Sequence, residues 1–187
     1  EVTIDSDLQF CSHIKKISAS AMKRLGVLFR GFTCRELKFM KQAYITYIRP
    51  SLEFSTPVWS PSLKRDIVLI ENVQRSFTRR IPCLKHLSYH ERLAVIGLET
   101  LEKRRLKFDL VMYYKIFHGI VSLDISGFFK VSPNLHCTRG HDYKIIKAPY
   151  VNSVLDNLFS TRCVDCWNDL PPEFVKLDSV FSFKKKI

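Results

Sequence analysis

The sequence predicts a mainly α-helical protein, in which a helical bundle follows a short N-terminal strand and precedes a smaller, irregular segment of helix and coil. Apolar residues recur every three or four positions through residues 12–119, which is the spacing of one helix face. Helix start and stop signals occur in the same region. The chain has 187 residues, 46% of them hydrophobic, which is enough to close a core. We therefore expect a strand within residues 1–11, a bundle over residues 12–119 and a third segment over residues 120–187.

The first helix is predicted from about Ser12 to Gly31. Its inner face carries apolar residues at steps of three and four, namely Ile14, Ile17, Ala21, Leu25 and Leu28. Gly31 suits a helix end, because glycine tolerates the left-handed backbone often found there. The strand before this helix is predicted from Val2, Thr3 and Ile4, which favour extended backbone.

A second helix is predicted from Thr33 toward Pro50. Thr33 and Glu36 match a capping box, in which each side chain bonds a free amide of the first turn. Proline lacks the amide hydrogen that continues a helix. We therefore expect a bend between Pro50 and Pro61.

Three further helices complete the expected bundle. The first covers about residues 62–82, where apolar residues again follow helical spacing and Pro82 closes the run. The second starts at Ser88, which forms a capping-box pattern with Glu91. The third covers about residues 100–119 and ends at a glycine.

The pattern changes after Gly119. Glycine and proline interrupt short apolar runs, and no helix of ordinary length is predicted before about Asn157. The chain begins without methionine and stops within an amphipathic run. We therefore expect residues 120–187 to be a truncated segment and the chain to be a piece of a longer protein.

Positive charge is concentrated in the first two helices. The chain carries 30 Lys and Arg against 18 Asp and Glu, a net charge of +12, and residues 11–50 hold nine basic residues and one acid, Glu36. A merely solvated helix face usually mixes the two signs, so the excess favours nucleic acid bound mainly through its phosphates. One or two of the interleaved aromatic residues are expected to stack on bases. The candidate contacts are Lys15, Lys16, Lys23, Arg24, Arg30, Arg35, Lys38, Lys41 and Arg49.

Cysteine and histidine offer a candidate metal site in the last third of the chain. Cys163 and Cys166 form a C-x-x-C, and Cys137 and His141 lie upstream; these are the ligand types of a structural zinc site. Two cysteines buried as small apolar residues produce the same pattern. We prefer the buried interpretation, because a lone C-x-x-C lacks a matching second pair, and so we expect no metal.

No self-contained active site is predicted. The sequence has no nucleotide-binding glycine loop, no nucleophile elbow and no paired carboxylates beyond its first few residues. His86 and His90 lie four apart, but Ser88 between them marks a helix start, so both are expected at the surface. No apolar run is long enough to cross a membrane. Six dispersed cysteines without a signal peptide favour an intracellular protein, nuclear or cytoplasmic and not secreted.

Several short phrases occur in a fixed order along the chain. They are I-D-S-D-L-Q-F at 4–10, R-P-S-L-E-F at 49–54, P-V-W-S-P at 57–61, I-E-N-V-Q-R at 70–75, T-R-G-H at 138–141, Arg162 with W-N-D-L-P at 167–171, and F-K at 183–184. In this combination and order they resemble the thumb and post-thumb region of reverse transcriptases from non-long-terminal-repeat (LINE-type, jockey-like) retrotransposons.

The resemblance implies a thumb-like helical body that grips an RNA template and a DNA primer for a parent polymerase that copies RNA into DNA. It implies that the metal-binding aspartates, with the Mg²⁺ that the parent would use, lie before residue 1, so that this chain alone is inactive and holds no cofactor. It assigns structural roles to the motif residues Arg49, Pro50, Glu53, Trp59, Arg75, Arg139, Gly140, His141, Arg162, Trp167, Asn168, Leu170 and Pro171.

Two other functions stay open on the sequence. The chain could be an independent helical DNA-binding protein of transposon origin with one helix in the major groove, which requires base-specific affinity. It could also be a zinc-stabilised interaction module built on Cys137, His141, Cys163 and Cys166. A thumb instead predicts binding that ignores base sequence and falls steeply with salt.

Overall fold

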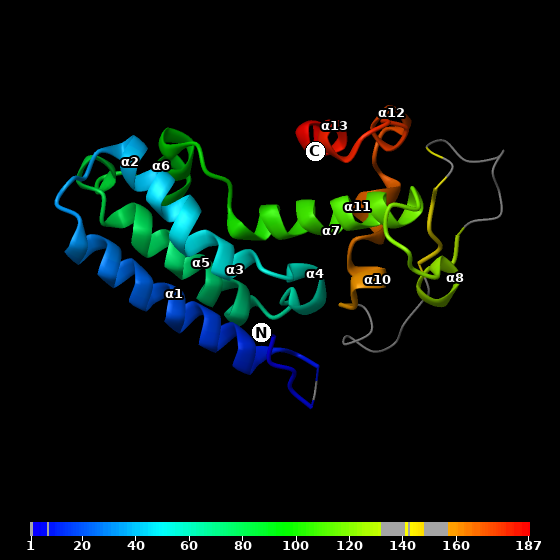
Figure 1. Ribbon diagram of the computed structural model, residues 1–187, viewed down its shortest axis with the longest axis horizontal. Coiled ribbons are helices and arrows are strands. Elements are labelled where there is room, and N and C mark those ends of the chain that lie inside the picture. The colour runs from blue at the N-terminus through cyan, green and yellow to red at the C-terminus, as the bar shows by residue number, and fades with distance from the viewer. Residues whose placement is uncertain (1, 7, 132–140, 142, 148–156) are drawn as a thin grey trace. The chain divides into compact units, whose positions relative to one another are not determined.

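The computed structural model describes residues 2–6, 8–131, 141, 143–147 and 157–187 of the chain (Figure 1). Within this part the fold is mainly helical, as the sequence predicts. The chain divides into two compact units: the first combines two long helices with shorter ones, and the second combines most of α7 with short elements.

The first unit, Glu1–Arg105, is the helical bundle. Helix α1 (Cys11–Gly31) packs lengthwise against α5 (Lys64–Arg79), so two segments far apart in the sequence lie side by side (Figure 1). The other elements are α2 (Leu37–Ala43), the π-helix η1 (Tyr44–Ile48), α3 (Arg49–Glu53), α4 (Thr56–Trp59), the 3-10 helix η2 (Pro82–Leu84), α6 (Tyr89–Ile96) and the start of α7 (Leu101–Phe117).

The core of this unit lies where α1, η1, α3 and α5 meet. The inner face predicted for α1 is confirmed: Ile14, Ala21, Leu25 and Leu28 are buried and Ile17 is half-buried. Tyr44 of η1 stacks on Phe77 of α5 with ring centroids 4.3 Å apart. Each large apolar side chain buried in this way contributes about 1.5–3 kcal/mol.

The strand predicted near the N-terminus is wrong for the described residues 2–6 and 8–11. A strand needs a neighbour to take its backbone hydrogen bonds, and the one β-bridge in the described part of the chain joins Val131 to Ile145. In this segment the hydrogen bonds are formed with side chains instead of a neighbouring strand. Thr3 N donates to His13 Nδ1 at 3.2 Å, and Ser12 N donates to Asp5 Oδ2 at 2.9 Å.

Of the two predicted capping boxes, only the second forms. Ser88 Oγ accepts from Glu91 N at 3.4 Å, and the Glu91 carboxylate accepts from Ser88 N at 2.7 Å. At the first, α2 begins only at Leu37, after Glu36, and no side chain caps it. The Arg35 side chain instead donates to the backbone carbonyls of Phe29, Phe32 and Cys34. These bonds hold the loop before α2 in a different conformation.

The chain bends within residues 50–61, as predicted, but the helical course continues past Pro50. That proline lies in the first turn of α3, where a missing amide hydrogen is tolerated. The break comes at Phe54, which is extended, and Ser55, whose φ of 55° is left-handed. Gly97 and Gly119 also adopt the left-handed φ expected of helix ends, 66° and 65°.

The second unit, Leu106–Ile187, combines most of α7 with short elements. These are α8 (Ile125–Phe128), α10 (Phe159–Arg162), α11 (Val164–Asn168), α12 (Pro172–Val175) and α13 (Val180–Lys186). Its core is an aromatic cluster around Tyr113 and Trp167, whose ring centroids lie 5.7 Å apart in an edge-to-face arrangement. Edge-to-face pairs of this kind add about 0.5–1.5 kcal/mol beyond the burial of area.

The units divide within α7, between Arg105 and Leu106, and not at Gly119, where the sequence placed the boundary. The first residue of α7, Leu101, packs in the core of the first unit. Later residues of the same helix, from Leu110 to Phe117, belong to the core of the second. A glycine that ends a helix is therefore a poor boundary signal when that helix contributes to both cores.

Candidate nucleic-acid interface

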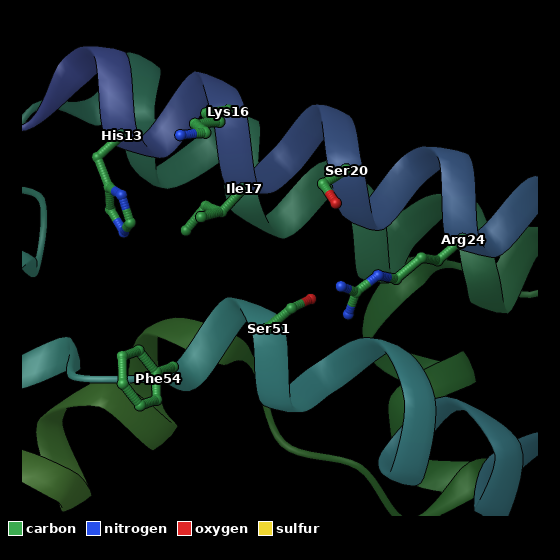
Figure 2. Close-up of a pocket in the computed structure, with 7 residues that line it drawn as sticks. All are labelled: His13, Lys16, Ile17, Ser20, Arg24, Ser51 and Phe54. Atoms are coloured by element: carbon green, nitrogen blue, oxygen red, sulfur yellow. The ribbon is translucent and has the colours of Figure 1, made fainter. Parts of the chain in front are cut away.

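A groove lies along α1 in the first unit. One part of it has a volume of about 270 Å³ and is formed between α1 and α3. Figure 2 shows side chains of α1 extending toward α3, with Arg24 reaching toward Ser51. Its lining consists of His13, Lys16, Ile17, Ser20, Arg24, Ser51 and Phe54.

A second part of the groove, about 580 Å³ in volume, adjoins the first, because Ser20 and Arg24 line both. The rest of its lining is mainly apolar and consists of Lys23, Val27, Leu28, Phe32 and Tyr47. From His13 to Leu28 the groove follows about 22 Å of helix, at 1.5 Å per residue. It is thus an elongated feature and suits a linear ligand.

Three of the nine predicted cations line the groove: Lys16, Lys23 and Arg24. All three are exposed, and within the described part of the chain no carboxylate forms an ion pair with them. Around α1, Lys16 and Lys23 lie about 20° apart and Arg24 lies within about 100° of both, so the three line the same side of the helix. These cations are therefore available to an anionic ligand.

The other six predicted cations lie elsewhere. Arg35 donates to the Phe29 carbonyl at 2.6 Å, Arg49 pairs with Glu53 at 3.6 Å, and the Lys41 ammonium lies against Gly97. Lys15, Arg30 and Lys38 are exposed but do not line the groove. Lys15 lies about 180° around α1 from Arg24, on the opposite side of the helix. The basic run of residues 11–50 is therefore not one continuous surface.

The interleaved aromatic residues divide in a similar way. Tyr44, Trp59 and Phe77 are buried in the core. By contrast, Phe32, Tyr47 and Phe54 line the groove and are 45%, 66% and 62% exposed. Periodicity alone did not separate these two groups, because the π-helical turn η1 changes which residues face inward.

His13 closes one end of the groove. It is buried, and its ring contacts Trp59 edge-on with centroids 5.2 Å apart. Burial lowers the pKa of His13, and positive charges nearby, including Lys16, lower it further. Its Nδ1 accepts a hydrogen bond from Thr3 N. His13 is therefore neutral at pH 7 and adds no charge to the groove.

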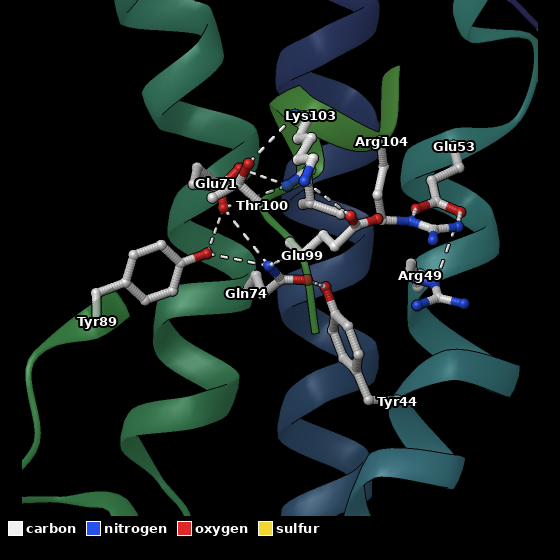
Figure 3. A network of polar contacts seen from close by, with 11 residues as sticks. Tyr44, Arg49, Glu53, Glu71, Gln74, Tyr89, Glu99, Thr100, Lys103 and Arg104 are labelled. Atoms are coloured by element: carbon white, nitrogen blue, oxygen red, sulfur yellow. Dashed lines mark hydrogen bonds and ion pairs between the residues drawn. The ribbon is translucent and has the colours of Figure 1, made fainter. Parts of the chain in front are cut away.

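The motif residues of the first unit build a polar network between helices (Figure 3). The Glu53 carboxylate lies between two guanidinium groups, those of Arg49 and Arg104, and bonds Arg104 through two nitrogens. Glu53 and Arg49 are both largely buried, with side chains 11% and 16% exposed. A two-point arginine–carboxylate pair fixes orientation as well as adding energy.

Glu71 and Gln74, the second and fifth residues of the I-E-N-V-Q-R phrase, occupy the middle of this network (Figure 3). Glu71 accepts from Leu101 N at 3.0 Å and from the Tyr89 hydroxyl, so it caps the first turn of α7. Gln74 Oε1 accepts from the Tyr44 hydroxyl at 3.1 Å. Burial, then the bond to Glu71, raises the pKa of Tyr89. Sequence reasoning missed both residues, although their spacing of three on an apolar helix face could have indicated them.

The remaining motif residues of this unit also pack into the structure. Trp59 is 1% exposed and its Nε1 donates to the Phe54 carbonyl at 2.7 Å. The Arg75 guanidinium lies over the Tyr89 ring, 4.3 Å from the centroid. His86 and His90 are exposed, as predicted.

In the second unit, Arg162 and Asp109 form a buried two-point ion pair. Arg162 Nε and Nη2 donate to the two carboxylate oxygens at 2.9 and 2.8 Å. The Cys163 thiol donates to the same carboxylate at 3.4 Å. Burial, followed by the charge of Asp109, raises the pKa of Cys163. Cys163 is therefore an inert part of the core, as the preferred interpretation expects, but the same interpretation is wrong for Cys166, which is exposed.

His141 and the W-N-D-L-P phrase supply hydrogen-bond partners for backbone groups in the second unit, where the helices are short. His141 Nδ1 accepts from Tyr143 N at 3.2 Å, so its Nε2 donates to the Trp167 carbonyl at 2.9 Å. Asn168 bonds both the amide and the carbonyl of Ile145, at 3.0 and 2.8 Å. Leu170 N donates to Trp167 O at 3.2 Å, and Pro171 precedes α12.

The candidate zinc ligands are not brought together in the described residues. Cys163 is buried and faces Asp109, Cys166 is exposed, and both ring nitrogens of His141 are already bonded. Cys137 lies outside the described residues, as do Arg139 and Gly140. Where the structure is described, no group of three His, Cys, Asp or Glu side chains is placed to hold a metal ion.

In the described ranges, no helix combines the length and apolar character that crossing a bilayer requires. No protein-family model matches the chain, and no solved structure matches it. The chain is similar to an uncharacterized protein of Caenorhabditis elegans, with 29% identity over 122 residues. The match covers 64% of this chain and 62% of that relative, so the chain spans less than two thirds of its length.

Proposed function

We propose that this chain is part of an RNA-directed DNA polymerase of the non-long-terminal-repeat retrotransposon class, in which it holds the RNA template and DNA primer. The observation that carries the proposal is the groove on α1, where Lys16, Lys23 and Arg24 stand exposed and without carboxylate partners in the described residues. Cations arranged along a groove attract a phosphate backbone and release its counterions. Such a protein works in the nucleus or cytoplasm, away from membranes.

The residues that carry the family resemblance support the proposal through their structural roles. Arg49, Glu53 and Arg75 of the thumb-like phrases contribute to the ion pairs and stacking of the first unit. Arg162 and Trp167 do the same in the second unit. If the chain shares the architecture of that polymerase class, its motif residues should hold the fold together, because each of them depends on contacts with partners elsewhere in its unit.

The chemical contribution of this chain is positioning. Lys16, Lys23 and Arg24 would neutralise phosphates and hold the primer end in place, whereas the aspartates that bind Mg²⁺ would belong to the parent polymerase. Contacts to phosphates carry no base information. We therefore expect binding that does not depend on sequence and that weakens as salt rises.

The test is a fluorescence-anisotropy titration of labelled RNA–DNA hybrid duplexes of two unrelated sequences, at several salt concentrations. The variant Lys16→Ala/Lys23→Ala/Arg24→Ala should bind about tenfold or more weakly at low salt. Its slope of log affinity against log salt should fall by about two to three, because three phosphate contacts are lost. The matched control is Lys15→Ala/Arg79→Ala/Lys85→Ala, which removes three exposed cations that do not line the groove.

Equal loss of affinity in the two triple variants would reject the groove as the binding site, since only net charge would then matter. A strong preference for one duplex sequence would favour the alternative, an independent DNA-binding protein that reads bases through one helix.

A further inference from the structure

The two walls of the α1 groove differ in chemistry. One wall, from α1, supplies Lys16, Lys23 and Arg24. The facing elements supply Tyr47 from η1 and Phe54 from the end of α3, which are 66% and 62% exposed. Cations thus follow one side of an elongated groove and aromatic rings the other.

The exposure of these rings is not explained by the core. Tyr44 and Trp59, their near neighbours in sequence, are 0% and 1% exposed. Tyr47 belongs to a π-helical turn, a rare arrangement that often occurs at functional sites. The turn buries Tyr44 and Ile48 and leaves Tyr47 outside. Two large aromatic rings, those of Tyr47 and Phe54, are therefore exposed at the surface of the groove and not buried in the core.

The ligand that matches both walls has anionic groups on one side and flat, apolar groups on the other. In a nucleic-acid duplex the base faces are stacked inside and cannot reach an aromatic side chain. In a single strand the bases are free, and stacking on aromatic rings is a general way of holding them. The separation of Lys16 and Arg24, about 12 Å along the helix, spans several phosphates of one strand.

We propose that the α1 groove takes an unpaired strand, with its phosphates on Lys16, Lys23 and Arg24 and its bases on Tyr47 and Phe54. This inference rests on the proposed function and narrows the ligand of the groove from the template and primer together to an unpaired segment of one strand. Stacking is tolerant of base identity, because every base has a flat face. The groove should therefore prefer single strands over duplex without a strong sequence preference.

The experiment uses the full chain and three labelled or competing probes. They are oligothymidylate of about 15 nucleotides, within the range of known single-strand site sizes, a hybrid duplex, and poly-glutamate, which has charge but no bases. The variants are Tyr47→Ala/Phe54→Ala and its conservative counterpart Tyr47→Phe/Phe54→Tyr. Phe181→Ala is the control, because it removes an aromatic ring that is 79% exposed and does not line the groove.

The alanine double variant should bind oligothymidylate about tenfold or more weakly, and its affinity for duplex and for poly-glutamate should stay unchanged. The conservative variant should retain wild-type binding, because it keeps both rings. Loss of all three affinities to the same degree, or no loss for oligothymidylate, would overturn the single-strand proposal.

The two proposals fail in different ways. If the triple cation variant weakens oligothymidylate and duplex while the aromatic variant weakens neither, the proposed function stands and the single-strand inference falls. If the triple cation variant changes neither affinity relative to its matched control, both fall. Poly-glutamate binding that responds to the aromatic substitutions as oligothymidylate does would instead identify the groove as a site for an acidic peptide.

Discussion

The two compact units satisfy their polar groups differently. In the first unit, long helices bond their own backbones, and Glu71, Gln74 and Glu53 link one helix to another. In the second, most elements beyond α7 are only four or five residues long, and such short helices leave much of their backbone unsatisfied. The side chains of Asn168 and Trp167, by contrast, bond the backbone of Ile145 and Tyr143, which lie outside the helices.

This difference bears on where a ligand can bind. In the second unit, Arg162 pairs with Asp109 and Lys147 pairs with Asp165, so these cations are already engaged within the chain. In the first unit, Lys16 and Lys23 of α1 are exposed, and no carboxylate in the described part of the chain forms an ion pair with them. The groove of the first unit therefore carries cations without a carboxylate partner, whereas the two-point pair of Arg162 with Asp109 helps to hold the second unit together.

The largest expected effect is the loss of the second core. Trp167 is fully buried and contacts the rings of Tyr113, Phe117 and His141. Trp167→Ala should cost about 3–5 kcal/mol, a large share of the stability of any small unit. The chain has two tryptophans, so Trp59 remains as a fluorescent reporter of the first unit. In urea, only the part of the helical circular dichroism that comes from the second unit should be lost early, while Trp59 fluorescence keeps a midpoint near that of the wild type.

A single shared transition in that variant would contradict the separation of the two units. The reciprocal variant, Trp59→Phe, leaves Trp167 as the reporter of the second unit and is the control. Both tryptophans should report the same transition only if the two cores unfold together.

A smaller effect is expected from the polar network of the first unit. Glu71→Ala removes a buried acceptor shared by Leu101 N and the Tyr89 hydroxyl, and should cost about 3 kcal/mol, because buried donors are left unpaired. The measurement is urea unfolding followed through Trp59. Glu102→Ala is the matched control, since Glu102 is an exposed acid in the first turn of α7. Equal midpoints for the two variants would show that the network adds no stability.

The two capping-box patterns allow a finer comparison within the first unit. Ser88→Ala should cost about 1 kcal/mol, because Ser88 bonds the first turn of α6. Thr33→Ala should cost much less, because no side chain caps α2. Thermal unfolding of both variants checks this, and the prediction fails if the cost at Thr33 matches or exceeds that at Ser88.

The smallest effect concerns pH. Burial lowers the pKa of His13 below its ordinary value of about 6.5, so the unfolded chain binds a proton that the native chain does not. The stability contributed by neutral His13 should be fully present above about pH 6.5 and should decrease as the pH falls below that value. His13→Gln should reduce the difference in urea midpoint between about pH 7.5 and about pH 5.5. A pH dependence identical to that of the wild type would exclude His13 as its source.

Much of the helical architecture followed from local patterns. The inner face of α1, the capping box at Ser88 and the helix end near Gly119 each depend on a few neighbouring residues, and the structure confirms them. The strand at Val2–Ile4 and the cap at Thr33 are wrong although each has a suitable local sequence. Thr3 N bonds the His13 side chain in place of a neighbouring strand, and α2 begins at Leu37, so Thr33 lies outside the helix that it is predicted to cap.

The sequence by itself determined that this chain is helical, strongly basic in its first two helices, and equipped with the phrases that resemble a polymerase thumb. Only the tertiary structure decided which cations stay open, because pairing depends on partners such as Glu53 and Arg104 that lie 51 residues apart. It also decided that Tyr47 faces out while Tyr44 faces in. Composition and periodicity act along the chain, whereas exposure and ion pairing depend on contacts that form only when distant segments pack.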